Sequence, residues 1–327
     1  MKPTHLLSSI LCTLFLVACG QRDRPTIESI TANKAPIPPT RARVLKVAFI
    51  MKSLTNPFFI EMAKGAREAQ RESGIQLNVQ ASTPETSVEQ QIRMVDTQIE
   101  ARVDAIVISP VDTRRLVPVL KKAQDAGIKI VNVDERLQPD AVAANGMRPV
   151  PFVGVDNERG AYLAAKFLVE KVHQPTQASI LEGIPGTYTA MDRKRGIEKA
   201  FAENGNLRIV ATAVANWKTD EAYDVAKGLF RTHPNIGVVY CANDMMAIGL
   251  IKCLQERGMT KVLVGGYDAV GEAREALRAG RLSVTVDQRA DRQGYISVMS
   301  ALKLFKGEPV SDTILVDTEV VTSASRK

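Results

Sequence analysis

The chain contains few of the residues that build metal or hydrolytic centres. Its three histidines, His5, His173 and His233, are far apart in the sequence, and no two cysteines have C-x-x-C spacing. A histidine-based zinc or hydrolytic site is therefore not expected. The sequence also lacks a Gly-rich phosphate loop and a nucleophile elbow. These absences predict a protein that is not an enzyme and that holds no metal or cofactor.

Long runs of positive charge are also missing. Lys and Arg number 43 against 36 Asp and Glu, a formal net charge of +7, and the densest basic run is residues 193–195. Because a nucleic-acid surface usually needs a larger basic patch, no nucleic-acid partner is expected. The length of 327 residues and the hydrophobic content of 45% suit two α/β domains of common size.

Only one long apolar run is present, and it lies at the N-terminus. Lys2 precedes this run of residues 6–17, and residues 16–20 read Leu-Val-Ala-Cys-Gly. A positive residue followed by about a dozen apolar residues is typical of a secretory signal and is too short for a membrane span. The small residue before Cys19 resembles the bacterial lipobox. We therefore interpret residues 1–19 as a lipoprotein signal peptide and Cys19 as the lipidated residue; the alternative is an ordinary signal peptide with an incidental cysteine.

The segment after this leader, residues 20–43, is polar and contains four prolines without apolar periodicity. It is expected to form a flexible tether. No later stretch is apolar over the roughly 20 residues that a membrane-spanning helix needs. Several acyl chains, at ~0.8 kcal/mol per buried methylene, anchor a protein stably. We therefore expect an exported protein in the periplasm or at the outer cell face, held to the membrane by its N-terminal lipid.

Two cysteines lie outside the leader. Cys241 closes an expected strand, and Cys253 lies in the expected helix that follows. An oxidising compartment allows such residues to pair. The spacing does not show that their Cβ atoms face each other, and two buried free thiols are the other outcome, so the sequence leaves both open.

From residue 44 onward, short β-branched runs alternate with longer amphipathic segments. Several helical segments end at glycine, such as residues 57–73 before Gly74 and residues 117–126 before Gly127, as is typical of helix C-termini. Near-continuous apolar strands in such an alternation predict an α/β fold of two doubly wound, Rossmann-like lobes with parallel sheets. The expected strands are residues 45–51, 76–80, 105–109, 129–133, 151–155, 179–181, 208–213, 237–241, 262–265, 282–286 and 314–316.

Polar and aromatic residues follow the expected strands. Ligands of open α/β sheets bind beyond the carboxyl ends of the strands, so two lobes with facing strand ends would collect these side chains in one cleft. Taken singly, each Asp or Asn is equally well explained as a helix cap, and Asn56-Pro57 fits the N-cap and N1 positions without a ligand. The collective pattern favours a cleft. The residues are Lys52-Ser53, Ser82-Thr83, Ser109-Pro110, Asp134-Glu135-Arg136, Asp156-Asn157, Asn216-Trp217, Asn243-Asp244, Tyr267-Asp268 and Asp287-Gln288.

A series of short segments carries a family resemblance. They include Lys52-Ser53-Leu54-Thr55-Asn56-Pro57-Phe58-Phe59, Val131-Asn132-Val133-Asp134, Gly154-Val155-Asp156-Asn157, Arg195-Gly196, Cys241-Ala242-Asn243-Asp244, Gly266-Tyr267-Asp268 and Val286-Asp287-Gln288. In order and spacing, across residues 45–321, the chain resembles the ribose-type periplasmic sugar-binding proteins, which are type I periplasmic binding proteins. The resemblance implies two similar lobes joined by a three-segment hinge.

The implied crossings between the lobes lie near Asp156, near Gln288-Arg289 and near Val316-Asp317. The N-terminal lobe would then comprise residues 44–155 plus 289–316. The C-terminal lobe would comprise residues 156–288 plus 317–327.

The resemblance also implies a ligand site. Phe58 or Phe59 and Trp217 would cover the apolar faces of a sugar, and charged and amide side chains would pair its hydroxyls. Phe58 and Phe59 could instead belong to the hydrophobic core, because Phe59 is in register with Met62 on one helix face. The ligand contacts carried over from the family are Asn56, Phe58, Phe59, Asp134, Arg195, Trp217, Asn243, Asp268 and Gln288.

Several positions depart from the ribose binders. Lys52 and Ser109 stand where the family has neutral Ser and Asn, and Glu135 replaces an Arg whose guanidinium Arg136 would then supply. Because an unpaired ammonium in a closed cleft is costly, we predict that Lys52 pairs with a carboxylate such as Asp134 or Glu135. The alternative is a solvated lysine at the rim. These changes argue against ribose itself and favour a more polar ligand, such as a polyol, an inositol or a sugar acid.

The predicted function is capture of a sugar-like ligand (pentose, hexose, polyol or sugar acid) by closure of the two lobes. The resemblance implies that a monomeric protein delivers this ligand to the permease of an ABC transporter. A sensory subunit that presents the ligand to a membrane kinase or chemoreceptor is the second interpretation. A repressor with the same core would need a DNA-binding module where this chain has a signal and a tether.

Overall fold

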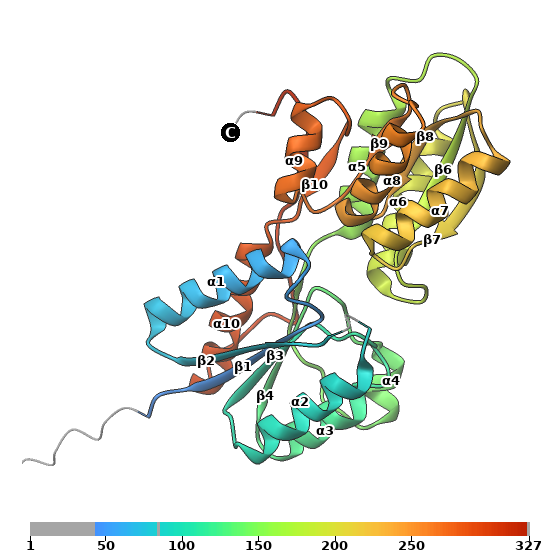
Figure 1. Ribbon diagram of the computed structural model, residues 1–327. Coiled ribbons are helices and arrows are strands. Elements are labelled where there is room, and N and C mark those ends of the chain that lie inside the picture. Colours follow the sequence, from blue (N-terminus) through green and yellow to red (C-terminus); the bar gives the residue numbers. More distant parts are fainter. Residues whose placement is uncertain (1–42, 84–85, 326–327) are drawn as a thin grey trace, which may run out of the picture. The chain divides into compact units, whose positions relative to one another are not determined.

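The computed structural model describes residues 43–83 and 86–325 (Figure 1). The predicted signal peptide, Cys19 and all but the last residue of the predicted tether lie outside the described residues. The chain from Arg43 onward forms one compact unit. Two parallel sheets organise this unit, and each defines a lobe.

Six parallel strands form the sheet of the first lobe, in the order β11-β5-β4-β3-β1-β2. β1 lies between β2 and β3, so the winding direction reverses beside β1, and ligands of doubly wound folds bind next to such a reversal. The central strands are buried on both faces, which explains their continuous apolar sequences. The strands are β1 (Lys46–Met51), β2 (Gln76–Ala81), β3 (Ala105–Ile108), β4 (Lys129–Val133), β5 (Phe152–Gly154) and β11 (Thr313–Leu315).

The second lobe repeats this arrangement with four parallel strands, in the order β7-β6-β8-β9. Its first strand, β6, again lies between the second and the third. β10 and β12 form a separate antiparallel pair, and a parallel bridge joins Gly265 at the end of β9 to Val284 just before β10. The strands are β6 (Thr176–Glu182), β7 (Leu207–Val214), β8 (Ile236–Cys241), β9 (Leu263–Gly265), β10 (Thr285–Asp287) and β12 (Glu319–Val321).

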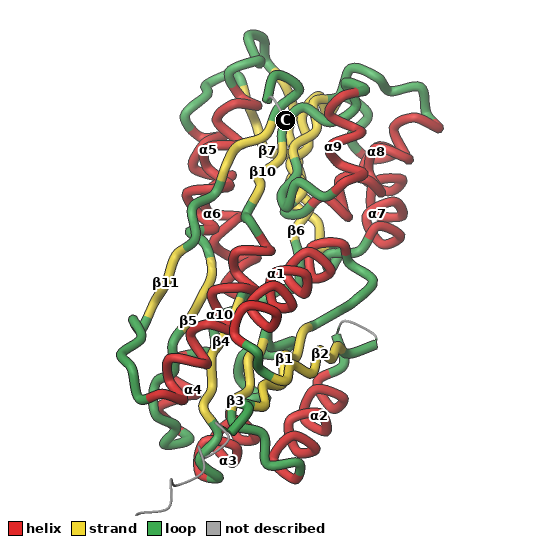
Figure 2. Tube along the Cα trace, turned by 90° about the vertical axis from the view of Figure 1, so that its left-hand side faces the viewer, coloured by secondary structure: helices red, strands yellow, loops and turns green. Residues whose placement is uncertain are grey.

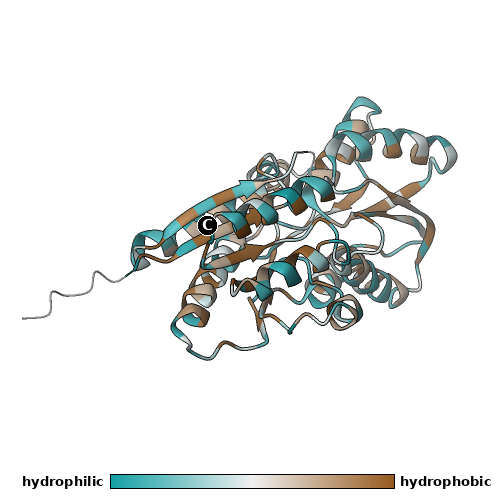
Figure 3. Cartoon of the chain, turned by 90° about the horizontal axis from the view of Figure 1, so that it is seen from below, coloured by the Kyte–Doolittle hydropathy of each residue, from teal (hydrophilic) through white to brown (hydrophobic). Residues whose placement is uncertain are grey.

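Helices connect the strands and cover both faces of the first sheet. Phe49 of β1 packs in one apolar layer with α1 and α10, whereas its neighbour Ile50 packs in the opposite layer with α2 and α3. Figure 3 shows the resulting pattern, with apolar stretches along the strands and mixed polarity on the helices. The helices are α1 (Pro57–Ser73), α2 (Val88–Glu100), α3 (Val117–Asp125), α4 (Pro139–Ala144), α5 (Asn157–Val169), α6 (Tyr188–Ala202), α7 (Thr219–Thr232), α8 (Asp244–Glu256), α9 (Gly271–Arg278) and α10 (Ala290–Lys306).

The close contact of α10 with α1 brings the C-terminal part of the chain back to the first lobe (Figures 1 and 2). A Cβ atom on Gly65 would lie 1.8 Å from the carbonyl oxygen of Asp291, and one on Gly294 would lie 2.0 Å from that of Met62. Only glycine therefore allows the two helices to approach this closely. After α10, β11 joins the first sheet, and β12 pairs with β10. The chain thus passes between the lobes three times, after β5, after β10 and after β11.

The predicted fold class, parallel α/β sheets in two lobes, is confirmed. The helix predicted over residues 57–73 has these bounds, and Asn56 caps it by accepting a hydrogen bond from the backbone N–H of Phe58. The strand predicted over residues 282–286 is observed later, as β10, and β12 was not predicted at all. Cys241 and Cys253 are both free and buried.

Candidate functional site

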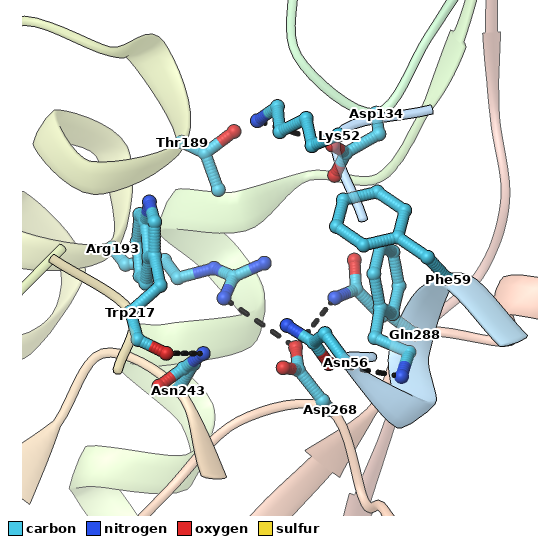
Figure 4. Close-up of a pocket in the computed structure, with 11 residues that line it drawn as sticks. Lys52, Asn56, Phe59, Asp134, Thr189, Arg193, Trp217, Asn243, Asp268 and Gln288 are labelled. Atoms are coloured by element: carbon cyan, nitrogen blue, oxygen red, sulfur yellow. Dashed lines mark hydrogen bonds and ion pairs between the residues drawn. The ribbon is translucent and has the colours of Figure 1, made fainter. Parts of the chain in front are cut away.

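A small cavity, part of it open to solvent, lies where residues of both lobes meet (Figure 4). Most of its lining residues directly follow a strand or begin the next helix, where open α/β sheets bind ligands. The lining residues are Lys52, Asn56, Phe58, Phe59, Asp134, Thr189, Arg193, Trp217, Asn243, Asp268 and Gln288.

Aromatic side chains form apolar walls of the cavity. Phe58 and Phe59 lie in the first turn of α1 with their ring centroids 5.0 Å apart in an edge-to-face arrangement. Both also belong to the apolar core of the first lobe, so the two interpretations of these residues are compatible. Trp217, between β7 and α7, is 7% exposed and packs directly against Gly183. Such walls suit the C–H faces of a sugar ring.

A buried guanidinium and a carboxylate form the polar side of the second lobe. Arg193 on α6 is 3% exposed, and its Nη1 lies 3.5 Å from Oδ1 of Asp268. The guanidinium stacks on the ring of Tyr267 at 3.7 Å, and its Nε donates to Asn157. Gln288 donates to the same Asp268 oxygen at 2.6 Å. These contacts fix charged groups that are strong partners for hydroxyls.

Lys52 lies at the opposite end of the polar lining and is 5% exposed. Its Nζ is 3.3 Å from Oδ2 of Asp134 and 3.4 Å from Oε2 of Glu135. The prediction that Lys52 pairs with one of these carboxylates is therefore confirmed, and the solvated alternative is wrong. Burial raises the pKa of Glu135, and the nearby ammonium of Lys52 opposes that rise.

Two asparagines of the lining are also helix caps. The side chain of Asn56 accepts a hydrogen bond from Phe58 N at 3.0 Å, and that of Asn243 accepts one from Met246 N at 2.9 Å. The Asn243 amide also donates to the carbonyl oxygen of Trp217. Capping and lining are therefore not exclusive, because one side-chain oxygen caps the helix while the residue still faces the cavity.

Backbone strain concentrates beside the cavity. Among the described non-glycine residues with positive φ, Asp134 (65°), Trp217 (65°) and Asp268 (118°) all line it. This left-handed region is unfavourable for residues with a Cβ, and such residues cluster at functional sites. The fold thus retains an unfavourable backbone at the three places where these side chains turn into the cavity.

The placement of Arg195 is corrected by the structure. Arg195 is exposed on α6 and pairs with Glu158 and Asp192, whereas Arg193 supplies the guanidinium of the cavity. Residues two apart on a helix are about 200° apart around its axis, so the two arginines face different directions. A signal was present in the sequence, because Arg193 shares its helical face with the apolar Ala190 and Ile197.

Arg136 and Ser109 also lie outside the cavity lining. Arg136 stacks on Phe152, 4.0 Å from the ring centroid, and donates to Thr313, so it does not replace the arginine of the ribose binders. Ser109 is fully buried and donates a 2.7 Å hydrogen bond to Oδ2 of Asp134. Its contribution is to orient Asp134 rather than to face the cavity.

Thr189 lines the cavity but was not predicted. It is 6% exposed, its backbone N–H donates to Oε1 of Glu135, and its hydroxyl has no hydrogen-bond partner within the described part of the chain. A buried hydroxyl without a hydrogen-bond partner lowers stability unless another group forms a hydrogen bond with it. Its signal in the sequence is weak, because a threonine in a helical first turn is common.

The lining offers hydrogen bonding and stacking. Residues 43–83 and 86–325 contain no group of three or more His, Cys, Asp or Glu suited to hold a metal ion. None of the helices in the same part of the chain has the length and apolarity that spanning a bilayer requires. Two α/β lobes that share one polar and aromatic cavity are the architecture of a solute-binding protein.

Comparison with known proteins shows the family to which this chain belongs. A model of the periplasmic binding protein domain matches residues 47–309, and the chain belongs to this family of periplasmic binding proteins. It is 36% identical to the D-ribose/D-allose-binding protein of Pseudomonas aeruginosa, over 80% of this chain and 83% of that protein. It is 32% identical to the D-allose-binding periplasmic protein of Escherichia coli, over 74% of this chain and 78% of that one.

A solved structure extends the similarity to three dimensions. It is a periplasmic solute-binding protein of an ABC transporter from Actinobacillus succinogenes with bound D-allose, 39% identical to this chain. The TM-score is 0.82, with 85% of this chain and 98% of that chain covered.

Proposed function

We propose that the protein is the sugar-binding component of an ABC transporter and that it captures one monosaccharide in the cavity between its lobes. D-Allose is the first candidate ligand, because all three similar proteins described above are named for it or contain it. The observation that carries the proposal is the cavity itself, in which aromatic walls and a buried polar rim occur together. A sugar ring presents the same combination of apolar faces and peripheral hydroxyls.

The site residues act in two groups. Asn56, Phe58, Phe59 and Asp134 contact the ligand from the first lobe, together with Lys52. Arg193, Trp217, Asn243, Asp268 and Gln288 contact it from the second lobe or from its link to the first. Since ligand contacts come from both lobes, bound sugar stabilises the closed arrangement, and the permease recognises that arrangement.

The proposed lobes are residues 44–155 plus 289–316 and residues 156–288 plus 317–327, linked by three segments that act as a hinge. Residues 1–19 are proposed as a lipoprotein signal peptide, Cys19 as the lipid anchor and residues 20–43 as a tether. The protein then acts as a monomer in the periplasm or at the outer cell face, held to the membrane by its lipid, where it meets its permease. A tether of this length leaves the binding unit free to reach that partner.

Isothermal titration and thermal unfolding of the protein with D-allose, D-ribose and myo-inositol test the ligand. We expect D-allose to bind most tightly and to raise the free energy of unfolding by about 2.7 kcal/mol at one hundred times Kd. Trp217→Ala tests the aromatic wall of the cavity and should weaken binding by about 1–3 kcal/mol through lost apolar contact. The proposal fails if none of these sugars, nor any other pentose, hexose or polyol, produces heat or a thermal shift.

A further inference from the structure

Glu135 is a fully buried acidic residue that does not line the cavity but contacts groups from both lobes. Its exposed fraction is 0%. Its side chain reaches Lys52, at the end of β1 in the first lobe, and the N-terminus of α6 in the second lobe. A buried carboxylate is rarely retained without such partners, because its desolvation is costly.

The backbone turn after β4 and the side chain of Asn132 hold Glu135 in place. Asp134 has a φ of 65°, which turns the chain sharply after β4. Asn132 then donates to the carbonyl oxygen of Glu135 at 2.8 Å and accepts from Leu137 N at 2.9 Å. The turn is thus fixed by the first lobe alone, and the carboxylate is presented to the second lobe as a preformed group.

The two carboxylate oxygens have different partners. Oε2 lies 3.4 Å from Nζ of Lys52, and Oε1 accepts the backbone N–H of Thr189 at 3.3 Å. Thr189 is in the first turn of α6, where N–H groups have no partner within the helix. Thr187 caps the neighbouring N–H of Ala190 with its own side chain. Glu135 therefore completes the capping of α6 from the other lobe.

The charges explain why this contact favours one arrangement of the lobes. Lys52 is shared between Asp134 and Glu135, so one cation faces two carboxylates. The N-terminus of α6 carries the positive end of a helix dipole and favours an anion beside it. Burial raises the pKa of Glu135 and Asp134 adds to that rise, whereas Lys52 and the Thr189 N–H oppose it without cancelling it. With α6 beside it, the buried carboxylate has the Thr189 N–H as a hydrogen-bond partner.

We propose that Glu135 is a positioning residue for ligand binding, which holds α6 against the first lobe and keeps Lys52 directed to the cavity. The inference rests on the proposed function, since α6 carries two cavity residues, Thr189 and Arg193. Glu135 touches no ligand in this scheme. It raises affinity by increasing the fraction of protein in the binding-competent arrangement, and the apparent Kd varies inversely with that fraction.

Two substitutions at Glu135 probe this role, and a third substitution elsewhere is the control. Glu135→Asp keeps the charge but is one methylene shorter, so its carboxylate lies farther from Thr189. Glu135→Gln keeps an oxygen that can accept from Thr189 but removes the charge. Glu170→Gln is the matched control, because Glu170 is an exposed glutamate at the end of α5. Circular dichroism and thermal unfolding establish that each variant is folded.

We expect Glu135→Asp and Glu135→Gln each to weaken D-allose binding by about tenfold, the effect of one lost charge-assisted hydrogen bond. The loss should appear mainly as faster dissociation, followed through the fluorescence of Trp217 in stopped flow. Small-angle scattering should show a larger radius of gyration for Glu135→Asp than for wild type, both without sugar and at subsaturating sugar. A purely structural role would lower the melting temperature without changing dissociation or the radius of gyration. Glu170→Gln should match wild type in every measurement.

Unchanged affinity, dissociation and radius of gyration in folded Glu135→Asp and Glu135→Gln would overturn the inference. If one variant does not fold, the other decides alone. Failure of the proposed function is a different result, because wild type itself would then bind no sugar. In that case the radius of gyration of the sugar-free variants still tests whether Glu135 holds the lobes together.

Discussion

At the scale of single residues, the position of the Trp217 indole depends on the absence of a side chain at Gly183. A Cβ atom on Gly183 would lie 1.9 Å from a ring carbon of Trp217. Real Cβ contacts are never this short, so the indole would have to move if position 183 carried any other residue. Trp217 also has a strained backbone, which limits how far it can adjust without cost.

Gly183→Ala should therefore displace the indole and weaken sugar binding by about 1–3 kcal/mol, close to the effect of removing the ring. The emission maximum of the single tryptophan should also shift, because its surroundings become more exposed. Titration calorimetry and fluorescence check both. Gly205→Ala is the control, since a Cβ there meets no atom within 4 Å, and it should leave both signals unchanged. Wild-type affinity in Gly183→Ala would show that the ring is not part of the site.

The sequence allowed most cavity residues to be predicted by two routes. Asp134 and Asp268 each come after an apolar strand, whereas Asn56, Phe58 and Phe59 were indicated as ligand contacts by the family resemblance. The sequence did not allow Thr189 or the role of Glu135 to be predicted. Both depend on a contact between α6 and the turn after β4, two segments from different lobes, and no local pattern specifies such a contact.

At the scale of secondary-structure elements, α6 decides which arginine reaches the cavity. Its buried face contains Ala190, Arg193 and Ile197, a spacing of three and four residues that defines one side of a helix. The family motif around Arg195-Gly196 indicated the wrong arginine, and the helical periodicity indicated the right one. β12 was missed for a related reason, because three residues that pair only with distant β10 have no periodicity of their own.

Arg193→Ala and Arg195→Ala are a matched pair on this helix. Removing Arg193 takes a buried guanidinium away from Asp268, so we expect a loss of sugar affinity of about 2–5 kcal/mol together with lower thermal stability. Removing Arg195 breaks only exposed ion pairs, with an expected effect of about 0–1 kcal/mol on stability and none on affinity. Arg193→Lys keeps the charge but not the planar fork, and it should recover only part of the binding. A larger affinity loss in Arg195→Ala than in Arg193→Ala would contradict the placement of the guanidinium.

At the scale of the whole molecule, the chain combines two similar lobes with an N-terminal segment that we interpret as a signal peptide followed by a lipid anchor. The lobes were predictable because the central strands are continuous apolar runs and most connections between strands contain a helix, which local sequence specifies well. The relation of the lobes to each other depends on three crossings and on contacts such as Glu135 with Thr189. These contacts are set by tertiary packing, so no local sequence pattern specifies which residues join the lobes.

The N-terminal interpretation has a direct test in Cys19→Ser. The described part of the chain contains no helix able to span a bilayer, and the only long apolar run of the sequence precedes Cys19. If the acyl chains on Cys19 are the anchor, the variant loses ~0.8 kcal/mol of membrane affinity for every methylene that is no longer buried, which is enough to release it. We expect wild type in the membrane fraction and Cys19→Ser in the soluble fraction, with equal sugar affinity in detergent and in buffer. Cys12→Ser, in the apolar run itself, is the matched control and should remain with the membrane. A Cys19→Ser protein that stays on membranes through salt and carbonate washing would exclude a lipid on this cysteine as the anchor.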